Sequence, residues 1–167
     1  MQKRGLGAVY LSNRVRDGFV PAAHCPLTAV VAPMGYGKTT AIDWFLSTRV
    51  REENAIVVRV SIYSGRLSDL WKRVQGAFSQ AGFDVLGAFP CPKSEADTAF
   101  VLDELAAALA VERPCYVFLD DFHLIEASRA AEFVCKLALR LPEQAHVIVA
   151  SRDRFLYGGD VVRLGRR

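Results

Sequence analysis

The chain has 167 residues, which is enough for one ordinary domain with a single sizeable core. Hydrophobic residues make up 51% and charged residues 23%, a composition that excludes a disordered chain. The net charge of +3 is too small to indicate nucleic-acid binding, and no apolar run is long enough to span a bilayer. Because the N-terminus also lacks the apolar stretch of a signal peptide, we expect a cytoplasmic protein.

Short apolar runs alternate with segments of helical periodicity along the chain. We predict a lead-in segment over residues 1–26, with a short helix near 9–15, and one α/β domain over residues 27–167. Five apolar runs rich in β-branched residues predict buried strands at 27–32, 55–61, 115–120, 146–151 and 161–164. The patterns between them predict helices over 38–50, 67–81, 94–109 and 127–141. Consecutive apolar positions in the strands indicate a parallel sheet with helices on both faces.

A phosphate-binding loop follows the first predicted strand. Residues 32–39 match the pattern G-x-x-x-x-G-K-[ST] except at the first position, where Ala32 stands. Glycines allow the backbone to approach phosphate oxygens, Lys38 can reach the β- and γ-phosphates, and the Thr39 hydroxyl can ligate Mg²⁺. A glycine-rich turn with a chance lysine is the less favoured reading. We assign nucleotide binding to Ala32, Pro33, Met34, Gly35, Tyr36, Gly37, Lys38, Thr39 and Thr40.

Two carboxylates end the third predicted strand. A strand end beside a phosphate loop is where a Mg²⁺-holding aspartate belongs, since the ion prefers hard oxygen ligands. We assign Asp120 to Mg²⁺ through water, and Asp121 to an attacking water that it could orient or deprotonate. Taken alone, the pair could instead cap the next turn. The following His123 is interpreted as a structural residue.

The fourth predicted strand is followed by Ser151 and Arg152. In a parallel sheet this strand can run between the loop strand and the acidic strand, so that Arg152 would sense the γ-phosphate. The alternative is a surface arginine that pairs with Asp153 or another carboxylate. Together, the motifs predict a three-layer P-loop NTPase sandwich with a five-stranded, mainly parallel sheet in the order 5-1-4-3-2. Lys38, Asp121 and Arg152 are the candidate catalytic residues for hydrolysis.

The three motifs together resemble the STAND-class ATPase domain of large LuxR-type bacterial transcriptional activators, such as the maltose regulon activator. Residues 32–40 are similar to that family's A-P-x-G-Y-G-K-T-T loop, in which alanine at the first position is usual. Residues 118–125 are similar to its acidic (Walker B) strand, and residues 147–152 to its sensor strand. The segment 60–64 departs from the Trp-x-x-Leu-Asp of many members.

The resemblance implies an ATP/ADP switch that uses Mg²⁺ and self-associates in its ATP form in the full-length family. The family's lid, sensor and helix-turn-helix domains have no counterpart in these residues, so we expect slow or no turnover and no direct DNA contact. Two other readings remain open at this point. A small P-loop kinase would need an acceptor pocket and an arginine-bearing lid, and a non-catalytic interaction domain would have lost nucleotide binding despite keeping Lys38, Thr39 and Asp120.

Overall fold

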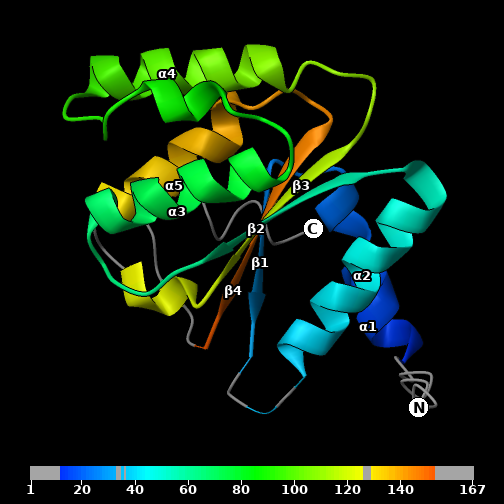
Figure 1. Ribbon diagram of the computed structural model, residues 1–167. Coiled ribbons are helices and arrows are strands. Elements are labelled where there is room, and N and C mark those ends of the chain that lie inside the picture. The colour runs from blue at the N-terminus through cyan, green and yellow to red at the C-terminus, as the bar shows by residue number, and fades with distance from the viewer. Residues whose placement is uncertain (1–11, 33–34, 36, 126–128, 153–167) are drawn as a thin grey trace, which may run out of the picture.

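A computed structural model describes residues 12–32, 35, 37–125 and 129–152. Its helices and strands alternate along most of the chain, as the sequence predicts (Figure 1). The strands are β1 (Leu27–Val31), β2 (Ile56–Ser61), β3 (Cys115–Asp120) and β4 (Ala145–Ser151). The α-helices are α1 (Asn13–Gly18), α2 (Lys38–Glu53), α3 (Leu67–Gln80), α4 (Glu95–Ala108) and α5 (Arg129–Arg140). Three 3₁₀ turns are η1 (Val20–Ala23), η2 (Val85–Ala88) and η3 (Phe122–Ile125).

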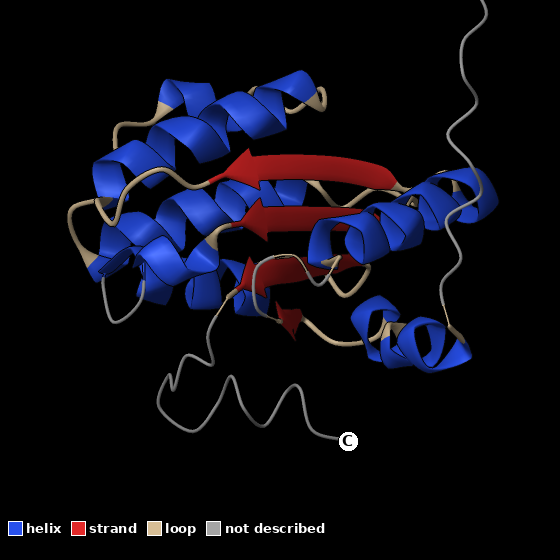
Figure 2. Ribbon diagram, turned by 90° about the horizontal axis from the view of Figure 1, so that it is seen from below, coloured by secondary structure: helices blue, strands red, loops and turns tan. Residues whose placement is uncertain are grey.

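The four described strands form one parallel sheet in the order β1-β4-β3-β2 (Figure 2). This order confirms that β4 runs between the loop strand and the acidic strand, with β2 at an edge. The sheet has four strands rather than the predicted five, and the segment 161–164 of the fifth lies outside the described residues. The register pairs Val31 with Ser151 and Ser61 with Asp120. The last residues of neighbouring strands therefore lie side by side at the carboxyl edge of the sheet.

The sheet divides the core into two clusters because side chains alternate between its faces. On β3, Tyr116 and Phe118 belong to the cluster under α2, whereas Val117 and Leu119 belong to the cluster under α3, α4 and α5. Figure 1 shows these two helix groups on opposite faces of the sheet. Both faces of the two central strands are therefore buried, which explains their unbroken apolar sequences.

The helix boundaries follow local signals in the sequence. Helix α4 begins after Ser94, whose hydroxyl accepts from the Asp97 backbone N–H at 3.0 Å while the Asp97 carboxylate accepts from the Ser94 N–H at 3.2 Å. This reciprocal pair is a capping box, and it begins the helix one residue after the predicted start at 94. Helix α2 runs three residues beyond its predicted end and stops at Asn54, which adopts a left-handed conformation with φ of 53°.

Two segments were only partly anticipated. The lead-in helix lies at Asn13–Gly18, later than the predicted 9–15, and is followed by the turn η1. The segment 82–93 between two predicted helices contains the turn η2, which Gln75 holds by donating to the carbonyls of Leu86 and Phe89. None of the described helices is both long and apolar enough to cross a membrane.

Candidate phosphate-binding site

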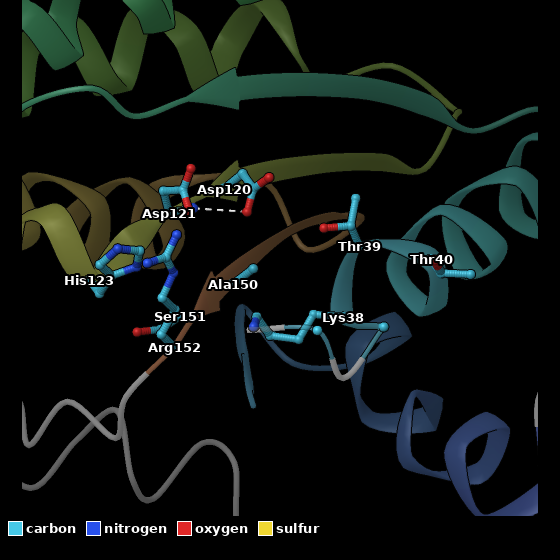
Figure 3. Close-up of a pocket in the computed structure, with 11 residues that line it drawn as sticks. Lys38, Thr39, Thr40, Asp120, Asp121, His123, Ala150, Ser151 and Arg152 are labelled. Carbon is cyan, nitrogen blue, oxygen red and sulfur yellow. Dashed lines mark hydrogen bonds between the residues drawn. The ribbon is translucent and has the colours of Figure 1, made fainter. Parts of the chain in front are cut away.

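A hollow of about 400 Å³ lies at the carboxyl edge of the sheet, where β1, β3 and β4 end. It brings together the three motifs, which are more than a hundred residues apart at their extremes (Figure 3). Parallel sheets place ligands at this edge because the strands end there and the following turns diverge. The lining residues are Gly35, Gly37, Lys38, Thr39, Thr40, Asp120, Asp121, His123, Ala150, Ser151 and Arg152.

The two described loop glycines have left-handed backbones, with φ of 85° at Gly35 and 76° at Gly37. L-residues rarely adopt these angles, so the loop needs glycine for its conformation. A Cβ at either position would meet no described atom within 4 Å, so the backbone angle rather than a lack of space requires glycine there. Gly37 is also the N-cap of α2, whose first backbone N–H groups can bind an anion.

Ala32 joins the loop to the sheet. Its backbone N–H donates to the Ser151 carbonyl at 3.2 Å, which fixes the loop strand to the end of β4. Its own carbonyl accepts from Lys38 Nζ at 2.5 Å, so the ammonium group is held across the base of the loop. Ala32 is not among the described residues with a positive φ, so its backbone conformation does not require glycine.

Asp120 and Asp121 are neighbours in different backbone conformations, since Asp120 is the last residue of β3 and Asp121 follows the strand. The Asp120 carboxylate accepts from the Asp121 N–H at 2.9 Å, which orients its Oδ1. Asp121 has φ of 57°, a left-handed angle that aspartate tolerates better than most residues, and its carbonyl accepts from the Leu124 N–H. Figure 3 shows the Asp120 carboxylate and the Thr39 side chain on facing sides of the hollow.

Mg²⁺ fits this donor set. Thr39 and Asp120 offer oxygen atoms of the hard type that the ion prefers, and they are the residues that would hold it. When bound, the ion would neutralise charge that develops on the phosphates. The residues that line the hollow are therefore of the kinds that can hold phosphate groups and a Mg²⁺ ion.

Ser151 and Arg152 differ sharply in exposure. Ser151 is buried at the end of β4, whereas Arg152 is exposed and reaches over the hollow beside Asp121 and His123 (Figure 3). Among the described residues no ion pair involves Arg152. The alternative partner Asp153 lies outside the described residues, as do the loop residues Pro33, Met34 and Tyr36.

His123 is the site residue that the sequence interpretation left out. It was read as structural, yet its ring lines the hollow from η3. Its Nδ1 is enclosed and has no hydrogen-bond partner in the described part of the chain. The only sequence signal was its position two residues after Asp121, on a segment that must turn back from the carboxyl edge of β3.

The comparisons with known proteins agree with this architecture. Solved structures that are similar to the chain over most of its length include the following two. One, PCH-2 from C. elegans, has a TM-score of 0.50 and 16% identity, covering 93% of this chain and 42% of that one. The other, Drosophila ORC bound to AT-rich DNA and Cdc6, has a TM-score of 0.55 and 11% identity, covering 91% of this chain and 51% of that one.

The fold is P-loop NTPase-like. The chain spans about half the length of these two structures or less, and at such identities the likeness concerns the fold alone. No protein-family model and no curated protein matches the sequence. The likeness thus supports the P-loop NTPase part of the sequence interpretation and leaves the STAND subclass as a proposal.

Proposed function

We propose that this chain is the ATP/ADP-binding switch module of a signal-responsive transcriptional regulator of the STAND class. The observation that carries the proposal is the meeting of three motifs in one hollow: the phosphate loop, the acidic pair and the arginine after β4. A glycine-rich turn with a chance lysine gives no reason for Asp120 and Arg152 to line the same space. The regulator role rests on the resemblance of these motifs to that family.

Each motif has a separate task in the proposal. The loop and Lys38 hold the β- and γ-phosphates, and Thr39 with Asp120 holds Mg²⁺. Arg152 binds the γ-phosphate and so distinguishes ATP from ADP, because a guanidinium offers several donors to one anionic group. Asp121 orients the water for any hydrolysis.

Weak hydrolysis is expected of these residues by themselves. Gly35, Thr39 and Arg152 are exposed, so bulk water reaches the site from several sides. Charge–charge stabilisation of a transition state is weak in such a high-dielectric environment. A switch needs only a difference in affinity between two conformations, not fast turnover.

Isothermal titration with ATP·Mg²⁺ and ADP·Mg²⁺ tests the proposal. The wild-type chain should bind both nucleotides, and Lys38→Ala should weaken both by roughly 10- to 100-fold, the usual worth of a hydrogen bond to a charged group. Lys72→Ala is the matched control, since Lys72 is an exposed lysine on α3 outside the hollow. Absence of binding at millimolar nucleotide would overturn the proposal, and phosphate transfer to a small hydroxyl compound would favour the kinase reading.

A further inference from the structure

Strand β2 forms one edge of the described sheet, and no described strand pairs with its outer side (Figure 2). Its inner side is fixed by the parallel register with β3 and by a hydrogen bond of 2.8 Å from the Ile56 N–H to the Pro114 carbonyl. Main-chain groups alternate in direction along a strand, so Ile56 and every second residue after it bond to β3. The residues between them turn their N–H and C=O groups to the open edge, and these are Val57, Arg59 and Ser61.

Proteins usually protect such an edge with proline, a bulge or a charged side chain. Strand β2 contains no proline, and its six residues pair with β3 without a bulge. Its one charged residue, Arg59, points inward. The guanidinium donates to Asp43 of α2 at 2.7 Å and lies over the ring of Phe118 on β3, 6.0 Å from the ring centroid. The charge is therefore drawn back over the sheet and does not shield the outward main-chain groups.

An apolar hollow of about 340 Å³ adjoins this edge on the side of α2. Helix α2 contributes Leu46 and Val50 to it, and β2 contributes Val57 and Arg59. Val50 is 45% exposed and Val57 is half-buried, so apolar surface remains uncovered beside the free N–H and C=O groups. This combination suits an added β-strand, because its backbone can take up the main-chain groups while its alternate side chains cover the hollow.

We propose that β2 pairs antiparallel with β2 of a second copy of this chain, across a twofold axis that joins the two sheets into one. The charges favour a second copy over a charged peptide, because Arg59 and Asp43 cancel each other and a copy brings the same balanced pair. A register centred on Arg59 would set two like charges opposite each other. A register centred on Val58 sets Arg59 beside Val57 of the partner copy and forms about four main-chain hydrogen bonds.

Amide hydrogen exchange of the wild-type chain, measured by NMR, tests the pairing because neighbouring residues of β2 should behave differently. The amides of Val58 and Val60 bond to β3 and should be protected at every protein concentration. The amides of Val57 and Arg59 should exchange rapidly in dilute solution. They should slow at least about fivefold as the concentration rises from about 10 μM to about 1 mM, the range in which a small interface associates. Edge amides that remain fast at the highest concentration would overturn the proposal.

Proline variants test the same contact by sedimentation velocity. Arg59→Pro removes an outward N–H but no hydrogen bond to β3, and the twofold axis doubles the loss, so dimerisation should weaken about tenfold or more. Arg59→Ala keeps the N–H and is the matched control, which should dimerise at least as well as the wild type. Val57→Pro removes the other outward N–H of the pairing and provides a second test if Arg59→Pro does not fold. Dimerisation of a folded proline variant at the wild-type level would overturn the pairing.

This inference does not depend on the proposed function, because β2 contributes no residue to the phosphate hollow. The proline variants should bind ATP·Mg²⁺ as the wild type does when titrated at concentrations where the chain is monomeric. Failure of the wild type to bind nucleotide would overturn the proposed function and leave the dimer standing, whereas a wild type that binds nucleotide and stays monomeric at about 1 mM would overturn only the pairing.

Discussion

Asp120 and Asp121 show how two identical neighbours acquire different tasks. Asp120 is still in the strand, so its side chain direction is set by the pleat of β3. Asp121 leaves the strand through a left-handed backbone, which turns its side chain toward a different part of the hollow. The hydrogen bond from the Asp121 N–H to the Asp120 carboxylate holds this divergence in place. One carboxylate can thus face Thr39 while the other lies beside Arg152 (Figure 3).

At this scale we predict that Asp120→Asn removes most of the benefit of Mg²⁺. An amide is a poorer ligand than a carboxylate for Mg²⁺ or its bound water, so the gain in ATP affinity on adding the ion should fall by roughly 10- to 100-fold. Titrations with ATP in Mg²⁺ and in EDTA measure this gain. Asp17→Asn on the exposed face of α1 is the control, and an undiminished Mg²⁺ effect in Asp120→Asn would contradict the assignment.

The helices and strands owe their positions to local patterns and their stability to packing. Period-two alternation on β3 and β4 supplies side chains to both core clusters, so each central strand is buried on both faces. The order of these elements was predictable because the apolar runs are short and because α3 and α5 have amphipathic patterns. The boundaries were less predictable, since the end of α2 depends on the left-handed turn at Asn54 rather than on hydrophobic periodicity.

The capping box of α4 provides a test at the scale of one element. Ser94→Ala removes the hydroxyl that accepts from the Asp97 N–H and should lower the free energy of unfolding by about 1 kcal/mol. Denaturant unfolding followed by circular dichroism measures the change. Ser47→Ala serves for comparison, because Ser47 is exposed within α2 and alanine favours a helix there. Equal effects of the two substitutions would show that the cap contributes nothing to stability.

At the scale of the whole molecule, folding buries the ionisable side chains of Cys115 and Tyr116 at the start of β3. Burial raises the pKa of the Cys115 thiol to about 12, and burial, reinforced by the charge of Glu53, raises the pKa of Tyr116 to about 12. Both groups are neutral when protonated. In the unfolded chain they release their protons near pH 9 and 10, whereas the folded chain retains them. The folded state therefore binds more protons in this window, and its stability falls as pH rises.

We accordingly expect the free energy of unfolding to decline from about pH 9 to about 12. Denaturant midpoints measured across this range should decrease steadily. Tyr116→Phe, which keeps the ring and removes the ionisable hydroxyl, should make the decline less steep. The same slope in the variant and the wild type would exclude a contribution from Tyr116.

The sequence by itself determined the α/β class, the succession of elements, the phosphate loop and the acidic pair. Each depends on residues close together in the chain, whose spacing reflects local geometry. The strand order that brings Arg152 and Asp121 to the same edge of the sheet was also predicted. Only the tertiary structure decided that His123 lines the hollow with one nitrogen enclosed. This depends on how η3 packs against the end of β4, and that contact carries no signal in the sequence.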